Sequence, residues 1–160
     1  MITVKELFDG AVEYDMKFVA HAIFWALSEK IIGLEDDANK LQEIVLNQEA
    51  IQKLTDQNIL GIERIKLFVI TTNNPSLFAF YFAEDILAAS GLHQNLFGEQ
   101  GTKITKSTRL MSKYMHFATP NLSTNFFEYR KRFVQYPAYI GHAVAGENVC
   151  YQLSRNEAAG

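Results

Sequence analysis

The spacing of hydrophobic residues divides the chain into a helical first part and a mixed second part. In the first part, apolar positions recur every three or four residues, which predicts three to four helices. Residues 16–32, MKFVAHAIFWALSEKII, are apolar around almost the whole helical circumference, so we expect a buried helix that Asp15 caps and Gly33 ends. Residues 34–60 predict two shorter helices with a break near Asn47.

The hydrophobic period changes to two in the second part, which is typical of β-strands. Two runs rich in β-branched and aromatic residues, 64–72 (RIKLFVITT) and 77–83 (LFAFYFA), flank the turn sequence NNPS and predict a hairpin. Phenylalanine occupies every other position of the second run, so one face of that strand is aromatic. Residues 84–97 then predict a helix, with acids in its first turn and Gly98 as its stop.

The remainder of the second part predicts one more helix and a second hairpin. The helix starts at Ser107 and covers STRLMSKYMHF, residues 107–117. The hairpin joins strands 138–144 and 148–154 through the turn AGE. We therefore expect an α+β fold, in which a helical N-terminal part of about three to four helices packs with an antiparallel sheet of about four strands from two hairpins.

Length and composition fit a single domain over residues 1–160, with a helical part at 1–61 and an α+β part at 62–160. A chain with 48% hydrophobic and 21% charged residues is typical of a water-soluble globular protein. The single cysteine, Cys150, excludes an internal disulfide and fits a reducing compartment. The first ten residues are charged and lack the apolar core of a secretion signal, and the longest apolar run is shorter than the ~20 residues of a membrane helix. We therefore expect a cytoplasmic protein without a membrane partner.

Charge is distributed unevenly, although the net charge is only −3. Residues 1–60 carry five basic and eleven acidic side chains, whereas residues 101–160 carry eight basic and three acidic ones. In the basic, aromatic segment 101–136, seven lysines and arginines stand against Glu128 alone. This asymmetry predicts a basic surface that suits nucleic acid, although the acidic helical part could equally dock against it within the chain.

Four of these cations recur at intervals of three or four residues within GTKITKSTRLMSKY, residues 101–114. On a helix they would form a one-sided basic stripe beside an aromatic ring, suited to a phosphate backbone. These candidate nucleic-acid-binding residues are Lys103, Lys106, Arg109, Lys113 and Tyr114. The alternative is a surface segment whose charges serve solubility.

The sequence NFFEYRKRFVQY, residues 125–136, predicts an amphipathic helix with an aromatic half and a charged half. Lys131 and Arg132 fall on the charged half, where Arg132 is spaced for an ion pair with Glu128. Arg130 projects into the aromatic half. It therefore reaches the surface between the rings, pairs with a buried carboxylate, or faces an anionic ligand such as phosphate. We include these three cations in the predicted nucleic-acid interface.

The chain contains no motif for catalysis or for cofactor binding. None of its four histidines has the spacing of a metal site, so we expect no metal and no cofactor. Cys150 could meet His142 across the second hairpin, with Glu147 as an orienting group, but strand cysteines are far more often inert core thiols. We therefore expect a protein that is not an enzyme.

These features predict a small accessory protein that binds nucleic acid, single-stranded or without sequence specificity, through its basic and aromatic C-terminal half. The alternative is an adaptor or inhibitor that uses the acidic helices against a basic protein partner. The apolar helical surface also suits a homodimer. The small size, the lack of disulfides and the lack of catalytic motifs also suit an accessory protein of a mobile genetic element.

Overall fold

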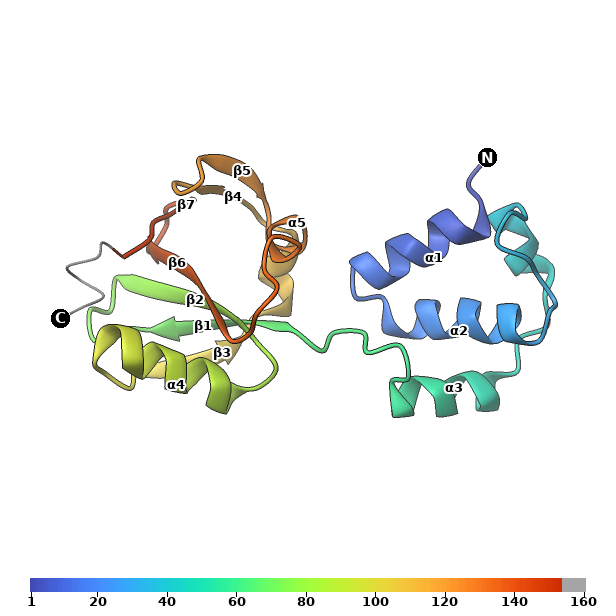
Figure 1. Ribbon diagram of the computed structural model, residues 1–160, viewed down its shortest axis with the longest axis horizontal. Coiled ribbons are helices and arrows are strands. Elements are labelled where there is room, and N and C mark those ends of the chain that lie inside the picture. Colours follow the sequence, from blue (N-terminus) through green and yellow to red (C-terminus); the bar gives the residue numbers. More distant parts are fainter. Residues whose placement is uncertain (154–160) are drawn as a thin grey trace. The chain divides into compact units, whose positions relative to one another are not determined.

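The computed structural model describes residues 1–153. It divides after Arg64 into two compact units (Figure 1), and each unit has its own hydrophobic core. The boundary lies close to the point in the sequence where the hydrophobic period changes. No helix among residues 1–153 has the length and apolar character needed to cross a lipid bilayer.

The first unit is entirely helical. Its elements are α1 (Val4–Glu13), α2 (Lys17–Ser28), the 3₁₀-helix η1 (Ala38–Glu43) and α3 (Gln48–Gln57). Thr3 and Glu6 form a capping box at the start of α1, because each side chain accepts a hydrogen bond from the other's backbone N–H. Asn47 caps α3 by accepting from the N–H of Ala50, which confirms the break predicted near this residue.

Two details of this unit differ from the prediction. Asp15 does not cap α2: the residue has a φ of 56° in the turn before the helix, and Met16 occupies the cap without a side-chain hydrogen bond. The helix also ends at Ser28, before the predicted stop at Gly33. His21, which is fully buried, instead links α2 to the segment after α3, because its ring bonds the carbonyl of Lys17 and the N–H of Leu60.

The second unit combines two sheets with short helices. In chain order it contains β1 (Lys66–Thr71), β2 (Leu77–Ala83), α4 (Ile86–Phe97), β3 (Lys103–Lys106), η2 (Thr108–Ser112), β4 (Tyr114–Phe117), β5 (Leu122–Asn125), α5 (Phe126–Arg130), β6 (Ala138–Val144) and β7 (Val149–Cys150). The larger sheet has four antiparallel strands in the order β3-β1-β2-β6, and the smaller sheet has the order β5-β4-β7. The predicted α+β class and four-stranded antiparallel sheet are confirmed.

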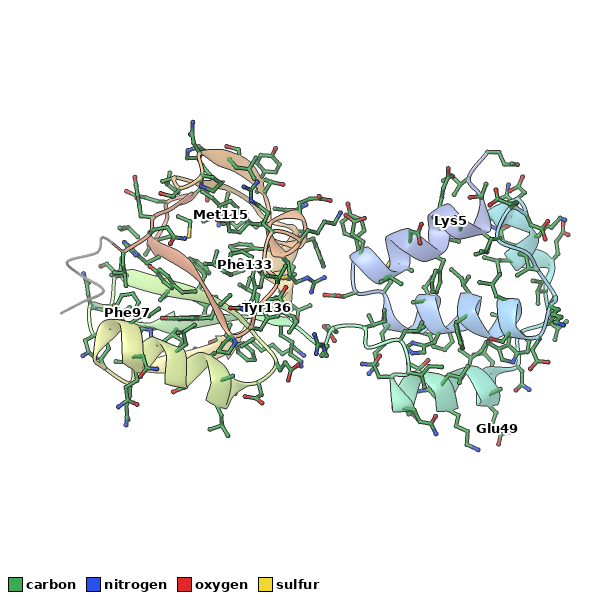
Figure 2. The ribbon with its side chains drawn as sticks, in the orientation of Figure 1. Lys5, Glu49, Phe97, Met115, Phe133 and Tyr136 are labelled. Atoms are coloured by element: carbon green, nitrogen blue, oxygen red, sulfur yellow. The ribbon has the colours of Figure 1, made fainter. Side chains whose placement is uncertain are left out.

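The alternation along β2 separates two cores. Phe80 and Phe82 face the small sheet, η2 and α5, whereas Ala79 and Tyr81 face α4. Figure 1 shows α4 on one side of the larger sheet and the small sheet on the other. In Figure 2, Phe97 lies on α4, and Met115 and Phe133 belong to the opposite layer. The predicted β1–β2 hairpin and the helix that Gly98 ends are both confirmed.

The second predicted hairpin is only partly formed. β6 joins the larger sheet through β2, and the returning chain pairs with it at one antiparallel bridge, His142 to Tyr151. Val149 and Cys150 instead pair in parallel with β4 of the small sheet. Residues 149–151 therefore pair with a strand of each sheet, and β3 is the fourth strand of the larger sheet. Ser154, the predicted end of this strand, lies outside the described residues.

Two predicted helices are much shorter than expected. Residues 107–117 form the 3₁₀-helix η2 followed by β4, because Met115 and Phe117 alternate into the core as strand residues. The helix predicted over 125–136 ends at Arg130, after which turns with i to i−3 hydrogen bonds lead away. Phe133 still packs in the core, with its ring 5.3 Å from that of Tyr129.

Gly141 is required where the returning strand crosses β6. Its φ is 152°, and an added Cβ would lie 2.5 Å from the Cys150 sulfur and 2.6 Å from the Tyr151 carbonyl oxygen. We expect Gly141→Ala to lower the free energy of unfolding by about 1–3 kcal/mol, or more if the strand cannot shift. Urea denaturation followed by circular dichroism measures this change.

Gly91 provides the matched control, because it is exposed on α4 and an added Cβ would meet nothing within 4 Å. Gly91→Ala should raise the stability by about 0.5–1 kcal/mol through helix propensity. Equal effects of the two substitutions would show that the crossing at Gly141 is not tightly packed.

Candidate functional site

The second unit contains a pocket of about 370 Å³ at one end of the face that the larger sheet turns towards the small sheet. Strands β1, β2, β3 and β6 supply one side, and η2, β4 and the turn after β6 supply the other. Its lining residues are Val69, Thr71, Phe78, Phe80, Lys103, Thr105, Ser107, Leu110, Lys113, Met115, Phe126, Ala143, Val144, Ala145, Gly146 and Glu147. The pocket therefore lies within one unit and is built from both of its layers.

The pocket combines an apolar floor with charged residues. Phe80, Met115 and Phe126 belong to the buried core, so the floor is held rigidly by packing. Lys103 and Lys113 contribute two exposed cations, and no ion pair within residues 1–153 engages either of them. An apolar cavity with a few polar groups is the usual form of a small-ligand site.

The structure brings together Lys103 and Lys113 from the predicted stripe, although they do not share a helix. Lys103 pairs with Thr71 and Thr105 with Val69, so these side chains share the pocket face of the sheet. Lys106 is an odd number of positions from Lys103 and therefore points to the opposite face, with Ile104, which packs in the α4 core. The prediction of a single helical stripe is wrong because residues 103–106 form a strand.

Arg109 and Tyr114 lie on the elements that follow. Arg109 is exposed on η2, between the pocket residues Ser107 and Leu110. Tyr114 begins β4 and is 66% exposed, while its neighbour Met115 points into the pocket. Along β4, successive side chains alternate, so Tyr114 presents its ring on the outer face of the small sheet.

The three cations of the α5 region are placed differently. The guanidinium of Arg130 is half-buried, donates from Nη1 to the carbonyl of Ile65 at 2.9 Å, and lies 5.8 Å from the ring centre of Phe127. Arg130 is therefore held by contacts with other residues of the chain. Lys131 is exposed and forms an ion pair with Glu128 at 3.3 Å, and Arg132 is exposed in the turn after the helix. None of the three lines the pocket.

A buried polar chain supports the strand that carries Lys103, and sequence patterns did not identify it. Tyr81 and His93 are both fully buried, and the Tyr81 hydroxyl donates to Nδ1 of His93. The Nε2–H of His93 then donates to Glu99 at 3.1 Å, and Glu99 also accepts from the N–H of Asn73. These bonds join β2, α4 and the segment that leads into β3. The neutral tautomer of His93 is set by its two partners.

The thiol of Cys150 is buried, and burial raises its pKa to about 12. It is therefore protonated at neutral pH, and a protonated thiol is a weak nucleophile. His142 bonds the hydroxyl of Tyr139 at 2.7 Å, and Glu147 lines the pocket instead of orienting this ring. The Cys150–His142–Glu147 arrangement thus gains no support. In residues 1–153, no group of three His, Cys, Asp or Glu side chains is placed to hold a metal ion.

Comparisons of this chain with protein-family models, curated proteins and solved structures gave no match. The function is therefore inferred from the pocket and the residues around it.

The Tyr81–His93–Glu99 chain predicts a dependence of stability on pH. Burial lowers the pKa of His93 below its ordinary 6.5, although Glu99 opposes the shift. The unfolded chain therefore takes up this proton first, so the free energy of unfolding falls as the pH drops from about 6.5 towards the lowered pKa. We expect His93→Gln to cost about 1–3 kcal/mol at pH 8 and to flatten the pH dependence below 6.5 in urea denaturation.

His116→Gln is the control, because this partly exposed histidine bonds Ser123 on the outer face of the small sheet. The variant should retain the pH dependence of the original chain. If His93→Gln shows the same dependence of stability on pH as the unsubstituted protein, the Tyr81–His93–Glu99 hydrogen bonds do not control the response to acid.

Proposed function

We propose that this protein binds single-stranded nucleic acid through the pocket of its second unit and the basic residues around it. The observation that carries the proposal is that Lys103 and Lys113, from separate elements, line one pocket with an aromatic floor. Single strands are bound by such combinations, because cations contact the phosphates while unstacked bases pack on aromatic or apolar surfaces. Duplex bases are already paired and stacked on one another, so they do not offer a free face or edge to such a pocket.

The size of the pocket supports the same ligand class. Its volume of about 370 Å³ lies at the lower end of the range of about 300–1,000 Å³ for ligand sites. A single nucleotide is a ligand of that scale, whereas a helix or a folded partner is not. The hydroxyl groups of Thr71, Thr105 and Ser107 add hydrogen-bonding capacity to the lining for sugar or phosphate oxygens.

Charge outside the pocket also favours a polyanion. The second unit carries nine basic and six acidic side chains, whereas the first carries six and twelve. Arg109 is exposed on η2, which bears the pocket residue Leu110, and Tyr114 is exposed on β4, which bears Met115. They provide a cation and a stacking surface for nucleotides beyond the one in the pocket. Lys106, Lys131 and Arg132 remain predicted contributors on other parts of the unit.

The proposal predicts salt-dependent binding that depends on the two lysines of the pocket. We expect Lys103→Gln combined with Lys113→Gln to weaken binding of a fluorescent single-stranded oligonucleotide. Because each phosphate contact adds about 0.7 to the slope of log affinity against log salt, the slope should fall by about 1.4. Fluorescence anisotropy between about 50 and 200 mM salt measures both quantities.

The matched control is Lys30→Gln combined with Lys53→Gln, which removes two exposed lysines of the first unit and changes the net charge equally. This variant should retain the affinity and the slope. Equal losses in both double variants would show a general charge effect instead of a site. Absence of salt-dependent binding to single strands at the lower salt concentration would refute the proposal.

A second candidate function is binding to a basic protein through the acidic first unit. Its supporting observation is a depression beside α3, where Glu49 and Asp56 lie with Lys53 and the amide side chains of Asn47 and Gln52. Charge reversal at these two acids should abolish that association, and the lysine substitutions in the pocket should leave it unchanged. The mixed-charge pocket of the second unit has no role in this alternative, so we favour nucleic acid.

A further inference from the structure

We propose that the pocket accepts one unpaired guanine base of the bound strand, with Glu147 as the residue that selects it. The inference rests on the proposed function and adds a base preference to it. It starts from the presence of a carboxylate in a pocket that otherwise presents cations, hydroxyls and apolar groups. A site for phosphate alone gains nothing from that carboxylate, because it repels the ligand.

The position of Glu147 is set by the turn that follows β6. Its backbone N–H donates to the carbonyl of Val144 at 3.0 Å, and the preceding Gly146 has a φ of 84°, which favours glycine. Both ends of this short turn line the pocket. Glu147 is exposed, and no ion pair in the described part of the chain engages its carboxylate. The carboxylate is therefore available to a ligand.

Guanine is the base whose edge best matches a carboxylate. Its Watson–Crick edge presents two adjacent donors, N1–H and the 2-amino group, and a carboxylate has two oxygens that accept in parallel. Adenine and cytosine place one amino donor beside a ring nitrogen that accepts, and thymine places its one N–H between two carbonyls. Each of these bases would hold a lone pair against the carboxylate, which disfavours it.

The lysines complete the match, because guanine also has two acceptors, O6 and N7, that lysine binds readily. Lys103 and Lys113 are therefore compatible with a guanine base next to the phosphates that they contact. The floor formed by Phe78, Phe80 and Met115 gives the base an apolar surface on which to pack. A base without two adjacent donors satisfies at most one oxygen of the Glu147 carboxylate, which lowers its affinity relative to guanine.

The test uses the full chain and fluorescent oligothymidylates of about ten nucleotides that differ at one central position, since single-strand sites of this kind cover roughly 4–16 nucleotides. The position holds guanine, hypoxanthine or thymine, and hypoxanthine lacks only the 2-amino group. We expect guanine to bind roughly 5- to 150-fold more tightly than thymine, as good bidentate base contacts do, with hypoxanthine between them. Anisotropy titration at one salt concentration measures all three.

Glu147→Gln is the decisive variant, because it preserves the size of the side chain and replaces one acceptor oxygen with a donor. It should reduce the guanine preference to about twofold or less, while binding of the all-thymine strand is retained or strengthened by the loss of a negative charge. Glu84→Gln, at an exposed acid outside the pocket of the same unit, should preserve the preference. Circular dichroism confirms that each variant is folded.

The outcomes separate this inference from the proposed function. Equal affinity for the three strands, with binding that still weakens with salt, overturns the guanine site and leaves single-strand binding intact. A guanine preference that survives Glu147→Gln overturns the role assigned to this residue. Absence of binding to every strand overturns both proposals.

Discussion

The second unit depends on the burial of β2 on both of its faces. Phe80 and Phe82 pack against one layer, and Ala79 and Tyr81 pack against the other, so a shift of one residue in register would exchange the two cores. The same strand pairs with β1 and β6 along its two edges. Because β2 fixes both neighbours, it also fixes the sheet face on which Phe78 and Phe80 form part of the pocket floor.

Local sequence signals predicted the elements that this strand organises. The period-two pattern, the NNPS turn and the stop at Gly98 identified the β1–β2 hairpin and α4, because these features are set by residues close in sequence. Aromatic residues in 125–136 did not define the helix length, since Phe133 reaches the core from a turn while Val134 is 91% exposed. The apolar pattern predicts which side chains are buried. The secondary structure of the segment depends on the elements against which those side chains pack.

The site could be predicted only in part, for the same reason. The density of basic residues in 101–136 indicated Lys103 and Lys113, which line the pocket. A helical period also places Lys106 on the same face as these two lysines, which the structure does not. Strand alternation separates Lys103 from Lys106, and this requires knowledge that β3 pairs with β1. The sequence indicated Glu147 only as an orienting group for His142. The Tyr81–His93–Glu99 chain had no local signal, because its members come from separate elements.

The charges that line the pocket are compatible with the proposed polyanionic ligand, although the chain as a whole is acidic. At physiological ionic strength, charges separated by more than about 8 Å are largely screened, so the net charge of −3 contributes little at the pocket. The local pair Lys103 and Lys113 acts at contact distance, next to an apolar floor where polar interactions are stronger than in water. In the proposed mode of binding, affinity comes from local contacts of the pocket and of the exposed Arg109 and Tyr114 next to it, and the Glu147 carboxylate distinguishes one base from another.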